Sequence, residues 1–133
     1  MTIKGSCLCG YVRYSVDGAL SDADHCHCSL CRKQHGAAFA TYADLNPKHF
    51  KWDAGEDCIR VYEMPSTAGW CFCSRCGSTV AGTYGGQVTS LVLGSVDGEP
   101  GVRPTAHIYA GSKAAWYDIV DDLPQYNERI TSG

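Results

Sequence analysis

Nine cysteines in a chain of 133 residues constrain this sequence more than any other feature. Their number is odd, and the N-terminal residues carry no apolar run typical of an export signal. We therefore expect a cytoplasmic protein with reduced thiols rather than a disulfide framework. Reduced cysteines in short clusters indicate metal binding. The clusters are Cys7-Leu8-Cys9, Cys26-His27-Cys28-Ser29-Leu30-Cys31 and Cys71-Phe72-Cys73-Ser74-Arg75-Cys76-Gly77.

Seven of these cysteines can make two zinc sites of different kinds. Zinc takes four ligands in a tetrahedron, so four cysteines close a structural site, whereas three protein ligands leave an open, reactive position. That fourth position would go to water, to a substrate thiol or to a residue from elsewhere in the chain. The closed set would be Cys7, Cys9, Cys73 and Cys76, and the open set Cys26, Cys28 and Cys31.

The spacing alone does not force this grouping. Cys71 completes a second Cys-x-Cys-x-x-Cys pattern and faces the same side as Cys73 if the segment is extended, so it is a formal candidate ligand. Cys58 stands alone in a strand pattern, which favours a buried, small apolar residue. Gly77 suits the tight turn that ligands at Cys73 and Cys76 would need.

The charge balance and the length narrow the classes of function. The 11 basic and 14 acidic residues leave a net charge of −3, which weighs against a nucleic-acid-binding protein, because such proteins usually carry a basic patch. No stretch reaches the ~18 apolar residues of a membrane span. We therefore expect neither nucleic acid nor a membrane as a partner, and a single domain over the 133 residues.

Strand and turn signals predict a mainly β fold built from antiparallel sheets with little helix. One or two helical turns are expected over residues 29–35, ended by Gly36. A hairpin turn is expected at Gly85-Gly86. The predicted strands cover residues 11–16, 38–44, 57–64, 78–84, 87–96 and 107–109.

Taken together, several motifs resemble the glutathione-dependent formaldehyde-activating enzyme family, also called the GFA or centromere protein V-like family. The resemblance runs nearly end to end and implies a zinc-stabilised β-tent, with residues 1–133 as a single GFA-like domain. The motifs are Gly5-Ser6-Cys7-Leu8-Cys9-Gly10, Cys26-His27-Cys28-Ser29-Leu30-Cys31, Phe72-Cys73-Ser74-Arg75-Cys76-Gly77-Ser78, His107-Ile108-Tyr109, Ser112-Lys113-Ala114-Ala115-Trp116-Tyr117 and Asp121-Asp122-Leu123-Pro124-Gln125-Tyr126.

The resemblance also implies a role for each cysteine set. Two Zn²⁺ ions per chain are expected, one structural in the closed set and one in the open set, where Cys26, Cys28 and Cys31 are the expected catalytic ligands. The family activity joins formaldehyde to glutathione to give S-hydroxymethylglutathione and is classed as a carbon–sulfur lyase, so a small thiol such as glutathione is the expected partner. Two alternatives stay open: a thiol carrier that accelerates no reaction, and a zinc-stabilised interaction module.

Other polar side chains could serve the open set. His25 and His35 could reach it as a fourth ligand or a proton shuttle, or lie on the surface. His27 would point away from the metal in an extended segment and could support the ligands beside it. Lys113 and Arg32 could attract a glutathione carboxylate, or remain solvated.

The large aromatic side chains favour the interior rather than a pocket wall. We expect His107 to pack against Tyr109 and Trp116. The expected core aromatics are Phe39, Trp70 and Phe72.

Overall fold

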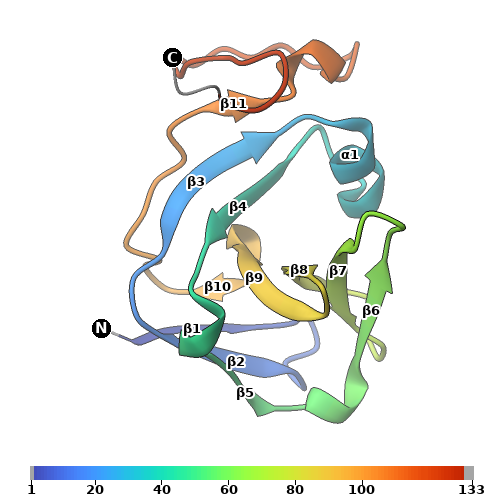
Figure 1. The fold of residues 1–133 in the computed structure, drawn as a ribbon, viewed down its shortest axis with the longest axis vertical. Coiled ribbons are helices and arrows are strands. Elements are labelled where there is room, and N and C mark those ends of the chain that lie inside the picture. The colour runs from blue at the N-terminus through green and yellow to red at the C-terminus, as the bar shows by residue number, and fades with distance from the viewer. Residues whose placement is uncertain (1, 131–133) are drawn as a thin grey trace.

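The computed structural model describes residues 2–130, in which strands form two sheets around a common core (Figure 1). The α-helix of this range is α1 (Ser29–His35), and short 3₁₀ turns interrupt the strands at η1 (Pro47–His49), η2 (Glu56–Cys58), η3 (Leu93–Ser95) and η4 (Ala110–Ser112). The strands are β1 (Thr2–Ser6), β2 (Arg13–Asp17), β3 (Ser21–Cys26), β4 (Ala40–Asp44), β5 (Phe50–Ala54), β6 (Ile59–Glu63), β7 (Ala68–Cys73), β8 (Thr79–Tyr84), β9 (Gln87–Val92), β10 (Val96–Asp97) and β11 (His107–Ile108).

One sheet has the strand order β10-β1-β2-β5, and the other has the order β11-β3-β4-β9-β8-β7-β6. The mainly β fold with little helix is therefore confirmed. One strand pair corrects the expectation of antiparallel sheets, because β11 runs parallel to β3. These two strands lie far apart in the sequence, so no hairpin forces them to be antiparallel.

The inner faces of the two sheets pack against each other and form the main core. Tyr14 and Val16 of β2 are fully buried in it. The seven-stranded sheet contributes Ala81 from β8 and Leu91 from β9, both 0% exposed. Because this face supplies the hydrophobic core, the opposite face of the same sheet can carry polar side chains.

Two strand predictions had wrong bounds because a 3₁₀ turn cuts the pattern. The strand predicted over 87–96 ends at Val92, since η3 redirects the chain and Val96 starts β10 in the other sheet. The strand predicted over 57–64 starts only at Ile59, after η2. Cys58 therefore lies outside the strand and is half-buried rather than buried. Four strands, β1, β3, β5 and β7, were not predicted from the sequence.

Two elements with local signals are confirmed. Helix α1 ends at Gly36, whose φ of 60° lies in the left-handed region and stops the helix. The hairpin between β8 and β9 turns at Gly85-Gly86, where both residues have positive φ values, 58° and 82°. A tight two-residue hairpin turn of type I′ requires that geometry.

The C-terminal segment, residues 105–130, folds back beside β3. The Thr105 N–H donates to the Ala23 carbonyl at 3.0 Å, and the Tyr109 N–H donates to the Glu128 carbonyl at 2.8 Å. Figure 1 shows this segment, coloured orange to red, lying along the outer side of β3.

No helix among residues 2–130 is long and apolar enough to cross a membrane.

Candidate metal centres and the adjoining cavity

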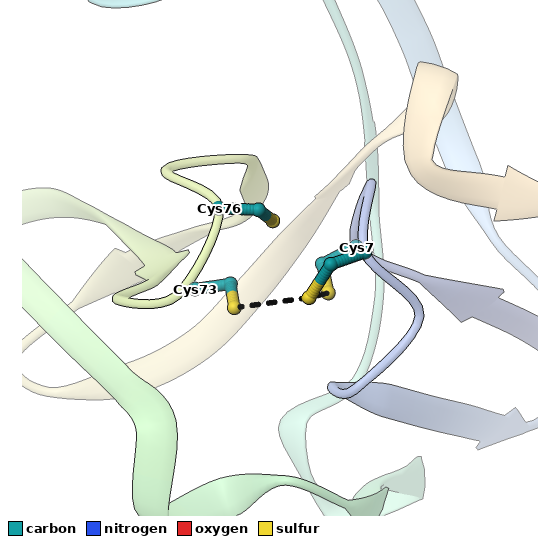
Figure 2. Close-up of side chains that lie close together, drawn as sticks. Cys7, Cys73 and Cys76 are labelled. Atoms are coloured by element: carbon teal, nitrogen blue, oxygen red, sulfur yellow. Dashed lines mark hydrogen bonds between the residues drawn. The ribbon is translucent and has the colours of Figure 1, made fainter.

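Four cysteine sulfurs, here called the four-cysteine group, meet between the two sheets. Cys7 and Cys9 lie in the loop between β1 and β2, while Cys73 ends β7 and Cys76 lies in the turn after it. Figure 2 shows Cys73 and Cys76 facing Cys7. The four Sγ atoms lie within 4.8 Å of one another. Gly77, with a φ of 78°, donates its N–H to the Cys73 carbonyl at 2.7 Å and closes the turn.

The spacing of these sulfurs fits a tetrahedral metal. Cys7 Sγ and Cys9 Sγ are 3.6 Å apart, and Cys9 Sγ and Cys73 Sγ are 4.0 Å apart. Four sulfurs at ~2.3 Å from a zinc ion would lie about 3.8 Å from one another. All nine cysteines carry free thiols, so no disulfide competes for these sulfurs. The group can therefore hold a metal ion, with a donor set typical of a closed zinc site.

The three-cysteine group consists of Cys26 at the end of β3, Cys28 just before α1 and Cys31 in its first turn. Their sulfurs also lie within 4.8 Å of one another. Cys28 is the N-cap of α1, and its Sγ accepts the Cys31 N–H at 3.3 Å. Cys26 and Cys31 are 5% and 7% exposed. The short helix therefore holds the sulfurs of Cys28 and Cys31 in a fixed relation, while Cys26 and Cys31 are largely shielded from water.

Without a cation, the thiols of this group cannot all ionise. Contacts with Cys26 and Cys31 lower the pKa of Cys28 to about 2, while contacts with Cys28 and Cys31 raise the pKa of Cys26. One sulfur carries the negative charge while its neighbour keeps its proton. A divalent cation removes this conflict, because it stabilises all of them as thiolates. Within residues 2–130, no histidine or carboxylate joins the group as a fourth ligand.

The three-cysteine group opens onto a cavity of about 410 Å³ on the face of the seven-stranded sheet turned away from the main core. The strand register explains the lining, because residues that pair across neighbouring strands share a face. Asp44, Ser90, Gly82 and Trp70 form one such row across β4, β9, β8 and β7. A Cβ on Gly82 would lie 2.3 Å from Ser90 Oγ, so glycine leaves room here. Small-molecule sites have volumes of this order.

Charged groups of both signs line the cavity. The acidic residues are Asp24 of β3 and Asp44 of β4. The basic residue is Arg129, which the C-terminal segment brings to the cavity. Burial, and then the neighbouring Asp44, raise the pKa of Asp24 to about 6, while Arg129 acts in the opposite direction. Arg129 was not predicted as a site residue, because no local pattern marks a residue whose position depends on the return of the C-terminal segment.

The two cationic side chains considered as partners for a glutathione carboxylate lie outside the cavity. The Lys113 ammonium donates to the Tyr117 carbonyl at 2.5 Å. Arg32 Nε donates to the His27 carbonyl at 3.3 Å. Neither residue lines the cavity, so the structure does not support that role for them.

The histidines beside β3 form a buried cluster behind the cysteines. His27 Nε2 lies 2.8 Å from His107 Nδ1, and His107 Nε2 lies 3.0 Å from the Asp121 carboxylate. His27 thus points away from the sulfurs, as expected for an extended segment. The predicted packing of His107 against Trp116 is wrong, because Trp116 is 73% exposed. Instead, these contacts connect the C-terminal segment to the backbone between two cysteines of the group.

The other two candidate histidines do not join the sulfurs either. His25 Nδ1 lies 2.7 Å from Thr41 Oγ1, and its ring packs on Phe39 at a centroid distance of 4.6 Å. Phe39 therefore belongs to the histidine cluster rather than to the main core. His35 Nε2 lies 2.9 Å from the hydroxyl of Tyr42.

Tyr42 of β4 contacts the three-cysteine group directly. Its hydroxyl donates to Cys31 Sγ at 3.4 Å and accepts the indole N–H of Trp70 at 2.8 Å. Burial, and then the nearby Cys31, raise the pKa of Tyr42, which keeps the phenol protonated. Trp70 is 8% exposed and belongs to a core cluster with Cys26 and Cys31, as predicted. It also lines the cavity, which the prediction of a core residue did not include.

Cys71 takes no part in either group. It is 1% exposed in the main core, and burial raises its pKa to about 12. Cys71 and Cys73 alternate regularly along β7, opposite Val61 and Ile59 of β6, and both are buried in the main core, but the Cys71 sulfur is not among the four that meet. The resemblance between the two Cys-x-Cys-x-x-Cys patterns therefore does not extend to their geometry.

Two known relatives of this chain, a protein family and a solved structure, identify its family. The sequence profile described as glutathione-dependent formaldehyde-activating enzyme matches residues 2–112, a range that contains both cysteine groups. A crystal structure of a Rhodobacter sphaeroides protein is similar, with a TM-score of 0.54 and 28% sequence identity, over 76% of this chain and 91% of that chain. Among curated proteins, no match was found. From the family match we conclude that the chain belongs to the glutathione-dependent formaldehyde-activating enzyme family.

Proposed function

We propose that this protein is a carbon–sulfur lyase-type enzyme that makes or breaks the adduct of a small thiol and an aldehyde, as S-(hydroxymethyl)glutathione synthase does with glutathione and formaldehyde. One observation carries the proposal: the three-cysteine group lines a cavity and offers a metal three sulfurs, whereas the four-cysteine group offers four. An open metal position can admit a ligand, but a closed one supports only the fold. The named family chemistry agrees with this class of reaction.

In this proposal each chain holds two zinc ions in a single domain over residues 1–133. A zinc ion in the three-cysteine group has one open position, where it would either stabilise the substrate thiolate or polarise the aldehyde oxygen. The free thiols suit the reducing cytoplasm. The structural ligands would be Cys7, Cys9, Cys73 and Cys76, and the catalytic ligands Cys26, Cys28 and Cys31.

The residues of the cavity would orient the thiol. In the forward reaction the thiol sulfur bonds to the carbonyl carbon, the π electron pair moves to the oxygen, and the thiol proton ends on that oxygen. Met64, Trp70 and Ile108 give the cavity an apolar wall that limits water around the reacting sulfur. The charged side chains suit the ammonium and carboxylate groups of glutathione.

The test is the rate of adduct formation from glutathione and formaldehyde with zinc-loaded protein. Exchange NMR suits it, because the reaction also proceeds without an enzyme. We expect a rate above the spontaneous one that Cys28→Ser abolishes. Serine still caps α1, but it removes a thiolate ligand. Cys58→Ser is the matched control, because Cys58 belongs to neither cysteine group.

The outcomes separate the three functions considered. Binding of glutathione without acceleration would make the protein a thiol carrier. A second metal with four protein ligands and no thiol binding would favour an interaction module. Elemental analysis should give two zinc ions per chain, and one ion per chain would refute the open zinc site.

A further inference from the structure

The hydroxyl of Tyr42 has three neighbours and a single hydrogen to share among them. A phenol offers one donor and two acceptor positions. The indole N–H of Trp70, 2.8 Å away, can only donate, so it takes one acceptor position. The hydrogen of Tyr42 is then directed either to Cys31 Sγ at 3.4 Å or to His35 Nε2 at 2.9 Å.

The charge on Cys31 decides between these two partners. Cys31 is 7% exposed, so water cannot solvate its sulfur well. A buried thiolate needs a hydrogen-bond donor, and hydrogen bonds to a charged acceptor are roughly twice as strong as neutral ones. Once Cys31 is a metal-bound thiolate, the Tyr42 hydrogen therefore goes to the sulfur. His35 must then carry its ring hydrogen on Nε2 and donate to the Tyr42 oxygen, which fills every position of the hydroxyl.

We propose that Tyr42 is a positioning residue of the three-cysteine group, whose hydroxyl holds Cys31 Sγ and stabilises its thiolate, with Trp70 and His35 directing that hydrogen bond. The proposal rests on the proposed function only in taking Cys31 as a metal ligand. Groups that hydrogen-bond to metal ligands orient them and tune the metal, and losing one typically costs ~10–100-fold in affinity. Tyr42 and Trp70 also line the cavity, so the same contacts shape the wall beside the sulfur.

The test compares Tyr42→Phe with the wild-type protein in a cobalt titration. We expect Tyr42→Phe to bind the second equivalent of Co²⁺ about 10- to 100-fold more weakly and the first equivalent unchanged. The thiolate-to-cobalt charge-transfer band of the second site should move to longer wavelength, because a sulfur without the hydrogen bond holds its lone pair less tightly. Neither readout depends on catalysis.

Tyr14→Phe is the matched control. Tyr14 is also a buried tyrosine with a bonded hydroxyl, 2.7 Å from Ser95 Oγ, but it lies in the main core. We expect it to leave both cobalt affinities and the spectrum unchanged. Wild-type affinity and spectrum in Tyr42→Phe would overturn the proposal. Equal weakening in both variants would do so as well, because the effect would then be one of general stability.

A second measurement needs no variant. In the zinc-loaded wild-type protein, ¹⁵N NMR should show His35 protonated on Nε2. Protonation on Nδ1 would leave Nε2 as an acceptor that takes the Tyr42 hydrogen away from Cys31, and would refute the proposal. A wild-type protein that binds only one cobalt ion would instead remove the premise shared with the proposed function. If the cobalt affinities and spectra are as expected but the protein does not accelerate adduct formation, only the proposed function is rejected.

Discussion

Three charged side chains line the cavity and would contact the thiol under the proposed function. Asp24 and Asp44 lie on adjacent strands of one sheet face, and Arg129 reaches the same cavity from the end of the chain. Under the proposed function, the acidic pair would contact the ammonium group of glutathione and Arg129 one of its carboxylates. Arg129 is exposed, so its contribution should be modest.

Replacing Arg129 by methionine removes this charge and keeps an unbranched side chain. We expect KM for glutathione to rise about two- to fivefold with kcat nearly unchanged, because exposed ion pairs contribute ~0.2–1 kcal/mol. Steady-state kinetics of the zinc-loaded protein measure this split. Arg103→Met is the control, because Arg103 pairs with Glu99 outside the cavity lining. The same rise in KM for both variants would mean that the effect comes from the change in net charge and not from a contact in the cavity.

At the scale of elements, the edge strand β6 depends on a close approach to β7. A Cβ on Gly69 would lie 2.3 Å from the Tyr62 carbonyl oxygen, and backbone cannot move aside as a flexible side chain can. We expect Gly69→Ala to lower the free energy of unfolding by about 1–3 kcal/mol in chemical denaturation. Gly94→Ala is the control, because a Cβ there would meet nothing within 4 Å. Equal stabilities would contradict the close pairing of β6 with β7.

The C-terminal segment is held by a side-chain contact as well as by its backbone. The Leu123 N–H, and then the His107 ring, lower the pKa of Asp121 below the ordinary value of 3.8. A lowered carboxyl pKa contributes stability above that ordinary value and loses it as the pH falls through the lowered one. The contact is therefore complete at neutral pH.

We expect Asp121→Asn to weaken this anchor and to speed trypsin cleavage after Lys113 at neutral pH. The time course is followed by mass spectrometry of the zinc-loaded protein. Asp118→Asn, which changes an exposed carboxylate of the same segment, should cleave at the wild-type rate. Unchanged cleavage in Asp121→Asn would mean that the backbone hydrogen bonds alone hold the segment.

At the scale of the whole molecule, the four-cysteine group joins the two sheets. Cys7 and Cys9 follow a strand of one sheet, and Cys73 and Cys76 lie at the end of a strand of the other. A structural zinc contributes ~10–16 kcal/mol in small domains, which is comparable with the ~5–15 kcal/mol net stability of a typical protein. The metal would therefore decide whether the two sheets stay together.

Metal removal tests this directly. We expect a strong chelator to abolish the β-sheet circular dichroism and zinc to restore it. Cys9→Ser should lower the melting temperature by at least ~10 °C, because several kcal/mol are lost. Cys58→Ser should stay close to the wild-type value, since Cys58 is only partly buried. A chelated protein that keeps its spectrum and melting temperature would show that packing alone holds the sheets.

Features that depend on neighbouring residues could be predicted from the sequence, whereas features that depend on contacts between distant residues could not. Helix α1 and the β8–β9 hairpin depend on a short pattern beside a glycine, so both were predicted. Strand β3 was missed because it has no apolar period: Asp24 faces the cavity, and His25 lies in the histidine cluster behind it. The cysteine grouping followed from spacing and family resemblance. Tyr42 and Arg129 were missed, because strand pairing and the return of the C-terminal segment bring them to the site.

That return also sets an order of assembly as the chain leaves the ribosome. Cys76 completes the four-cysteine group when little more than half of the 133 residues have been made. The three-cysteine group is complete even earlier, but the wall that contains Tyr109 and Arg129 comes from residues that are made later. While the chain is being made, these sulfurs can therefore meet a metal donor before Tyr109 and Arg129 form the wall beside them.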